Sequence, residues 1–428
     1  MSDSPDTLLV EEHSRPITTT VTVLRTGTRS DPPGKEGLAY LTAEMLQRGA
    51  GDWSQAKLAD EIEFLGSTLS VNVGRSTTTV TGDALTRNLD RYENIVQTLL
   101  TQPRFEPEEF QKLKRQTAAD LVHVRENDNM LCQRFLVKDL YKEHPYGRPR
   151  KGTLGTLESI QLSDVKAFYQ EHYHGSEALT AAAGDITNER LNQFALASVG
   201  QLPLREQSHE APPPAPKLKG IETILVDKPD RTQIPVMMGH TTIHANHPNY
   251  LPLFVGNIVF GGTFTARLSQ EIREKRGWSY GAYSSIHGDR NLGTFLMRFS
   301  PSVKDTLPAI ELAISMMKDV VRDGVTLDEL TSAKNYLCNS HAFGIDTSVK
   351  RLYELILQRL TGRPDDWLNS FVERVSNVTL DNVNSALAQH LDPASMVLSV
   401  VATADEFRPI LDAWDGKGSL SQVDYRSE

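Results

Sequence analysis

The sequence is poor in cysteine, in concentrated positive charge and in long apolar runs. Its two cysteines, Cys132 and Cys338, stand far apart in apolar surroundings, which favours buried thiols over a disulfide, a metal site or a nucleophile. The formal net charge is -10 at pH 7, and no basic stripe offsets it. We therefore expect neither a nucleic acid nor a membrane as a partner.

The N-terminal sequence and the length of the apolar stretches indicate the cellular compartment. The opening residues, MSDSPDTLLVEEHSRP, lack a basic region followed by an apolar one, and no apolar window approaches the length of a membrane-spanning helix. We expect a cytoplasmic protein. A periplasmic location is the alternative if a leader has been removed.

The composition that is present indicates a globular chain of more than one domain. The 428 residues are 39% hydrophobic and 23% charged, enough for two or more separate cores. Near the midpoint, a polar and then proline-dense stretch, REQSHEAPPPAPKLKG, is typical of an extended linker. We predict domains at residues 1–208 and 219–428, joined by a linker at 209–218.

The two predicted domains show a faint internal repeat. In the first, a β-branched run from Ile17 leads through a Pro/Gly-rich loop into an apolar helix, Gly37 to Gly49. In the second, a similar run from Thr232 leads through a polar loop into the apolar helix YLPLFVGNIVFGG. Further strand-like stretches and amphipathic helices follow in each, so each half predicts an α+β unit with antiparallel strands and packed helices.

The helix from Gly37 to Gly49 has the pattern of an ordinary core helix. Its apolar residues recur at three-to-four-residue spacing, and Gly49 is placed to end it. The stretch that contains it, TVTVLRTGTRSDPPGKEGLAYLTAEMLQRGA, nevertheless resembles the opening of the M16 (insulinase, or pitrilysin) family of zinc metallopeptidases. In that family the helix carries His-x-x-Glu-His, and the resemblance puts Tyr40, Ala43 and Glu44 at those three positions.

These three residues lack the chemistry of a zinc site. Two imidazoles one helical turn apart hold zinc, and a carboxylate between them activates water. The phenol of Tyr40 ionises near pH 10, Ala43 cannot act as a base, and Glu44 stands alone. Near the family's third ligand, the closest candidates are Ala119 and Asp120. We expect no metal or other cofactor in this chain, and a core helix with an exposed Glu44.

A second motif lies in the predicted second domain. The stretch FGGTFTARLSQEIREKRGWSYGAYSS resembles the family's second-domain signature, which implies that Arg273 and Tyr280 reach the scissile peptide. Gly277 is placed to end the helix that carries Arg273, with Tyr280 on the following strand, so both side chains could converge on one carbonyl oxygen. Two simpler interpretations stay open: Arg273 as a cation at a helix C-terminus, and Tyr280 as a packing residue of a strand.

The histidines do not form a convincing ligand set. His240, His244 and His247 fall on a predicted strand and loop, where this spacing does not share a face, and we expect a packing role for the first. His172 and His174 fit a helix end and loop better than ligands.

The resemblance implies two homologous α/β-roll domains that form a bowl-shaped half of a clamshell. It further implies the zinc-free subunit of a heterodimeric M16-type metallopeptidase, inactive alone, whose homologous partner carries His-x-x-Glu-His and zinc. The substrate would be an unfolded peptide, held in part by strand addition to an edge such as SVNVGRSTTTV. The alternative is a pseudopeptidase with a structural or peptide-binding role, possibly a homodimer. An autonomous metalloenzyme with unconventional ligands is the least favoured hypothesis.

Overall fold

The chain folds into two compact units, each assembled from several stretches of sequence. The structure is a computed structural model that describes residues 5–176, 178–204 and 212–428. The first unit takes its described residues from 1–123, 148–210 and 344–357, and the second from 124–147, 211–343 and 358–428. The proposed domain limits at 208 and 219 stay a prediction. Of the proposed linker, 209–211 lie outside the described residues, and 212–218 contain neither helix nor strand.

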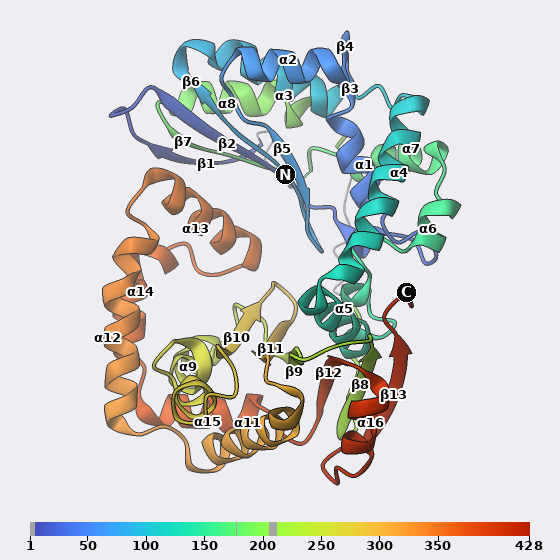
Figure 1. Ribbon diagram of the computed structural model, residues 1–428. Helices are drawn as coiled ribbons and strands as arrows, with labels where there is room; N and C mark the ends of the chain where they lie inside the picture. Colours follow the sequence, from blue (N-terminus) through green and yellow to red (C-terminus); the bar gives the residue numbers. More distant parts are fainter. Residues whose placement is uncertain (1–4, 177, 205–211) are drawn as a thin grey trace. The chain divides into compact units, whose positions relative to one another are not determined.

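The first unit is built on a five-stranded sheet in the order β1-β7-β2-β6-β5 (Figure 1). Its strands, with the short β3-β4 ribbon, are β1 (Asp6–Glu11), β2 (Ile17–Leu24), β3 (Gly49–Ala50), β4 (Trp53–Ser54), β5 (Ser70–Val73), β6 (Thr78–Leu85) and β7 (Leu179–Gly184). Its helices are α1 (Leu38–Leu46), α2 (Gln55–Phe64), α3 (Leu89–Thr101), α4 (Pro107–His123), α6 (Leu154–Ser159), α7 (Leu162–His172), α8 (Asn188–Ala197) and the start of α13 (Ser348–Thr361).

The second unit is built on a six-stranded sheet in the order β10-β11-β9-β12-β8-β13. Its strands are β8 (Ile221–Asp227), β9 (Val236–Thr242), β10 (Ala282–Gly288), β11 (Gly293–Phe299), β12 (Met396–Ala402) and β13 (Ser419–Asp424). Its helices are α5 (Asp128–Tyr141), α9 (Tyr250–Asn257), α10 (Arg267–Ser269), α11 (Val303–Asp323), α12 (Leu327–Gly344), α14 (Trp367–Asn377), α15 (Leu380–His390) and α16 (Ala404–Asp412), together with the end of α13 and two π-helical turns, Ile258–Gly262 and Gln270–Lys275.

The two sheets share one topology, which confirms the internal repeat. The strands β1, β7, β2, β6 and β5 occupy the same order as β8, β12, β9, β11 and β10. In both sheets the first pair of this series is parallel, and the other three pairs are antiparallel, as the sequence predicts for most of the sheet. β13 adds a further parallel strand beside β8. By this correspondence β5 and β10 are equivalent edge strands.

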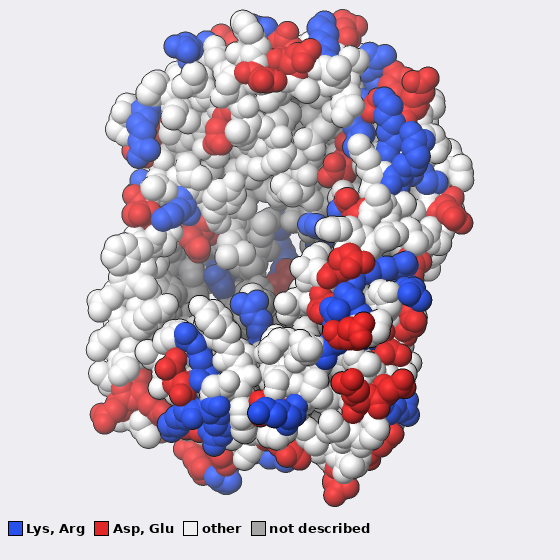
Figure 2. Space-filling model, viewed as in Figure 1, with Lys and Arg blue, Asp and Glu red and all other residues white. Residues whose placement is uncertain are grey.

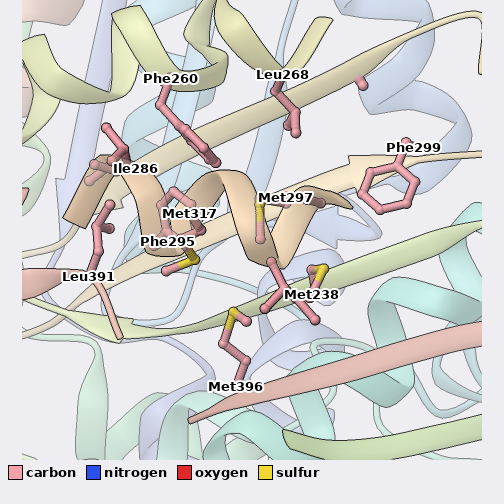
Figure 3. Packing of buried hydrophobic residues seen from close by; sticks show 14 of the residues in the cluster. Met238, Phe260, Leu268, Ile286, Phe295, Met297, Phe299, Met317, Leu391 and Met396 are labelled. Carbon is pink, nitrogen blue, oxygen red and sulfur yellow. The ribbon is translucent and has the colours of Figure 1, made fainter. Parts of the chain in front are cut away.

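The sheet of the second unit separates two apolar cores. On β11, Phe295 and Met297 join the larger core, which Figure 3 shows from close by with Phe260 and Met317, whereas Leu296 faces the other side. That other side is covered by α5, which contacts β12, β9 and β8 (Figure 1). A segment of the first half of the sequence therefore completes the core of the second unit.

One helical stretch corrects the expectation about apolar windows. Tyr250–Lys275 is long and apolar enough, by length and composition alone, to cross a membrane. Of its most apolar window, 67% is buried inside the structure, and Phe260 and Leu268 lie in the core. Such burial is typical of a core helix.

On the face of the molecule shown in Figure 2, acidic and basic side chains are interspersed.

Candidate functional site

Helix α1 carries Tyr40, Ala43 and Glu44, the residues that the sequence analysis compared with a zinc motif, and is anchored in the first core. Leu41, Ala43 and Met45 are each 0% exposed. The helix ends at Leu46 with Gln47 as its C-cap, whereas Gly49, predicted to end it, begins β3 with a φ of 122°. The apolar spacing therefore predicted the helix correctly but not its last turn.

A buried carboxylate holds the start of α1. The backbone N–H groups of Gly37 and Ala39 donate to Asp31 over 2.9 and 2.7 Å, which satisfies two of the free donors at a helix N-terminus. Burial raises the pKa of Asp31 to about 7, although these two hydrogen bonds and nearby Arg148 oppose the shift. The helix thus starts on a carboxyl group that titrates near neutral pH.

Tyr40 and Glu44 lie one turn apart on the partly exposed side of α1, and both are poorly suited to a metal. Burial, followed by the charge of Glu44, raises the pKa of the Tyr40 phenol, which opposes the phenolate that a metal needs. Burial also raises the pKa of Glu44. Ala43, which the sequence places at the general base, points instead into the core. Glu44 is half-buried and not fully exposed, which corrects the sequence-based expectation.

A lysine that the sequence analysis missed lies at the same place. The Lys151 ammonium forms an ion pair of 2.6 Å with Asp120 of α4 and lies 5.4 Å from the centre of the Tyr40 ring. Its charge also lowers the pKa of Glu44 against the effect of burial. Asp120, one of the two third-ligand candidates, thus lies close enough to Tyr40 and Glu44 to raise the pKa of both, but it is already paired with a cation.

The backbone fixes the loop that carries Lys151. A side chain at Gly37 would lie 2.8 Å from the backbone of Lys151, and one at Gly152 would lie 2.1 Å from the carbonyl oxygen of Glu36. Both glycines have positive φ angles, 97° and 75°. The loop therefore rests directly on the first turn of α1, which holds the lysine over the helix. The basic run RPRK was the only sequence signal for it.

The residues at these positions do not fit zinc. A structural or catalytic zinc site needs at least three deprotonated ligands, and an ammonium within the set repels the ion. In the described parts of the chain, no group of three or more His, Cys, Asp or Glu side chains is arranged to hold a metal.

Arg273 and Tyr280 come together in the second unit. Arg273 lies in the π-helical turn Gln270–Lys275, and Gly277, with a φ of 63°, ends that turn by donating to the Arg273 carbonyl over 2.9 Å. Tyr280 lies in a bend two residues before β10, not on the strand as predicted. The reason is Ser279, whose hydroxyl donates to Gly281 and accepts from the Ser300 backbone, which closes a tight turn.

The guanidinium of Arg273 is stacked between two rings. Its central carbon lies 4.1 Å from the centre of the Phe264 ring and 5.1 Å from that of Tyr280. Tyr280 is 92% exposed. The Nη1 atom of Arg273 lies 3.3 Å from Glu274 but has no hydrogen-bond partner among the described residues. The Nη1 atom is buried, and the contacts with the two rings and with Glu274 hold the guanidinium beside an exposed phenol. Sequence reasoning missed Phe264, because a single phenylalanine in FGGTF gives no signal of stacking.

His240 and the two cysteines are further side chains that the sequence analysis considered as functional candidates. His240 donates to the Thr241 carbonyl and accepts from the Asp392 N–H, and its ring lies 5.4 Å from Phe295, so it packs as expected. Burial lowers the pKa of His240. Both cysteines are free; Cys132 is buried as predicted, but Cys338 is only partly buried.

Comparison with known proteins agrees with both motifs. A family model described as insulinase, peptidase family M16, matches residues 7–154, and one described as the peptidase M16 inactive domain matches residues 159–337. The chain belongs to peptidase family M16. Its M16 relatives include an uncharacterized zinc protease of Rickettsia bellii, 24% identical over 320 residues that cover 74% of this chain and 75% of the relative.

Solved M16 structures share the fold. A crystal structure of a peptidase M16 inactive domain from Pseudomonas fluorescens matches with a TM-score of 0.86 and 23% identity, over 94% of this chain and 96% of that one. A chain of complex III2 from Candida albicans matches with a TM-score of 0.75 and 14% identity, over 94% and 95%. At these identities the likeness concerns the fold alone.

Proposed function

We propose that this chain is the zinc-free subunit of a heterodimeric M16 metallopeptidase, in which Arg273 and Tyr280 bind the scissile carbonyl while a homologous partner supplies zinc. The observation that carries the proposal is the stacked pair itself. The Arg273 guanidinium lies 5.1 Å from a phenol ring that is 92% exposed, on a turn fixed by Ser279. A residue kept only for packing would not be so exposed.

The chemistry of this pair suits peptide hydrolysis. When a hydroxide attacks the carbonyl, negative charge develops on its oxygen, and donors already in place stabilise that charge. Arg273 supplies a charged donor and Tyr280 a neutral one. The hydroxide would come from the partner's zinc site, because Tyr40, Ala43 and Glu44 cannot supply one. The chain alone is then inactive.

The test is cleavage of a quenched fluorescent peptide by this chain mixed with an M16 chain that carries His-x-x-Glu-His. Arg273→Ala and Tyr280→Phe should each lower kcat by about 10²–10³, the usual effect of removing one such donor. Arg290→Ala and Tyr336→Phe, exposed residues of the same types outside the stack, are the matched controls and should retain activity. Rates within twofold of the wild type for both site variants would contradict the catalytic role.

A non-catalytic role, as a structural or peptide-binding pseudopeptidase, is the second candidate. It is favoured by α12, where Leu327, Tyr336 and Phe343 are 64%, 52% and 74% exposed, an unusual set of large apolar side chains on one helix. This candidate predicts a stable homodimer that gains no activity with a zinc-bearing partner. Light scattering of the purified chain, alone and mixed, distinguishes the two.

A further inference from the structure

Helix α5 leaves part of the sheet of the second unit uncovered, next to the stacked pair. The helix packs on β12, β9 and β8, whereas the same face of the β10-β11 hairpin carries Tyr283 and Arg298, which pair directly across the two strands. A cavity of about 420 Å³ lies there, between this hairpin and the first turns of α5. Gly281, the residue that follows Tyr280, lines it.

The polar groups of this cavity are unusually free. Arg298 is exposed and forms no hydrogen bond, ion pair or ring contact with any described residue, and it is the one charged residue among those that line the cavity. The amides of Asn129 and Gln133 and the hydroxyl of Tyr283 have no hydrogen-bond partner in the described chain either. Most surface arginines of this unit are paired, as Arg267 is with Glu329 and Arg231 with Asp128. A cation surrounded by unused donors is suited to an anion with several acceptor oxygens.

Tyr283 is held at the mouth of the cavity by its neighbour. A side chain added at Gly281 would lie 2.6 Å from the Tyr283 ring, so the ring packs against the bare backbone one residue after Tyr280. Met130 and Met237 add apolar surface to the lining. The lining therefore combines apolar side chains with one cation and several amides, which suits a carboxylate on a short aliphatic stem.

From this arrangement we infer that the cavity binds a carboxylate of the peptide substrate, through Arg298 with Asn129, Gln133 and Tyr283. The inference rests on the proposed function for its choice of a peptide. One residue of extended chain spans about 3.3–3.6 Å, so a peptide whose carbonyl lies at Tyr280 places a side chain one or two residues away at the cavity. The carboxylate comes from a glutamate side chain or from the C-terminus of a short peptide.

The test measures binding to the full chain without any partner, by fluorescence anisotropy of labelled heptapeptides blocked at both ends. A peptide with a central glutamate should bind about tenfold more tightly than its glutamine counterpart, because the carboxylate forms charge-assisted hydrogen bonds. Arg298→Gln should abolish that preference, and Arg290→Gln, which removes an exposed charge at the tip of the same hairpin, should preserve it. A glutamine peptide with a free C-terminus distinguishes the two sources, since it regains tight binding only if the terminal carboxylate fits.

The outcomes separate this site from the proposed catalysis. Equal binding of the two blocked peptides excludes a glutamate side chain as the source, and if the peptide with a free C-terminus also binds no more tightly, the carboxylate site is overturned. A preference for a carboxylate that persists in Arg298→Gln, or no binding of any of the three peptides, overturns it as well. Because no hydrolysis is measured, a failure of Arg273→Ala to affect cleavage would contradict the catalytic proposal and leave this result intact. Circular dichroism of Arg298→Gln confirms that a lost preference does not arise from unfolding.

Discussion

At the scale of single residues, the charged groups around α1 decide what this helix can do. Lys151 brings a positive charge close to Tyr40 and Glu44 and pairs with Asp120, so the chain already supplies a cation to the acidic groups at this place. Restoring ligands alone should therefore not restore metal binding.

The lysine gives a direct prediction. The double variant Tyr40→His, Glu44→His places two imidazoles one turn apart facing Asp120, yet Lys151 still repels a dication and competes for the carboxylate. Adding Lys151→Ala should tighten zinc binding at least tenfold, measured by competition with a chromophoric chelator. Lys166→Ala, an exposed lysine on α7, is the matched control. Equal zinc affinities of the double and triple variants would contradict a blocking role for Lys151.

Asp31 predicts a pH dependence of stability. Its folded-state pKa of about 7 lies above its usual value of 3.8, so the folded state binds the proton more tightly than the unfolded state. The contribution of Asp31 to the free energy of unfolding is thus fully present below about pH 4 and is lost as the pH rises through 7. Urea unfolding between pH 5 and 8 should show the wild type losing stability relative to Asp31→Asn.

The control for this titration is Asp52→Asn, at an exposed position of the same unit. The difference between wild type and this variant should not change over the same pH range. A wild type whose stability relative to Asp31→Asn does not change between pH 5 and 8 would mean that Asp31 is ionised throughout and that its hydrogen bonds outweigh burial.

At the scale of elements, the close approach of strands β9 and β11 makes the stability of the protein sensitive to substitution. Gly239 lies on β9, where an added Cβ would lie 2.1 Å from the backbone oxygen of Phe295 on β11. Gly239→Ala should therefore destabilise the protein by about 1–3 kcal/mol or more, because neither strand can move without disturbing its pairing. Chemical denaturation measures this change in the free energy of unfolding.

Gly344 at the end of α12 is the matched control, since nothing lies within 4 Å of an added Cβ there. Gly344→Ala should leave stability unchanged or raise it by up to about 1 kcal/mol, because alanine favours a helix. If both variants lost the same stability, the close approach of β9 and β11 would not be the cause.

Several helices and strands could be predicted from the sequence because the residue patterns that indicate them are local. The β-branched run from Ile17 gave β2, and apolar spacing gave α1. The bend at Tyr280 could not be predicted, since Ser300, twenty-one residues away, holds it through Ser279. The same reason hid Lys151, whose partner Asp120 lies thirty-one residues away.

At the scale of the whole molecule, the feature that matters is the exchange of segments between the sequence halves. Helix α5 lies in the first half of the sequence, yet Leu131, Phe135 and Leu136 form a core with Val397 and Val401 of the second unit. The sequence analysis did not predict this helix, and its main packing strand, β12, lies more than two hundred residues away, so no local signal reveals the contact. A division at the proline-dense stretch therefore removes a layer of the second core.

Truncation tests this dependence. Residues 212–428 produced alone should aggregate or unfold at a lower temperature than the second unit of the full chain, because the apolar face under α5 meets water. A fusion of residues 124–147 to this fragment should restore solubility, monitored by scanning calorimetry. A fusion of the same length with Leu131 and Phe135 replaced by serine controls for the added chain. A fragment that is soluble and fully stable without α5 would contradict the account.

The five passages of the chain between the two units, after residues 123, 147, 210, 343 and 357, also constrain how such a protein can be inherited. The matching strand orders are those expected of a duplicated ancestor, but each unit now includes a segment from the other half of the sequence. A recombination event at the midpoint would separate a helix from the sheet it covers. A protein of this architecture is therefore inherited intact only when both copies stay in one reading frame.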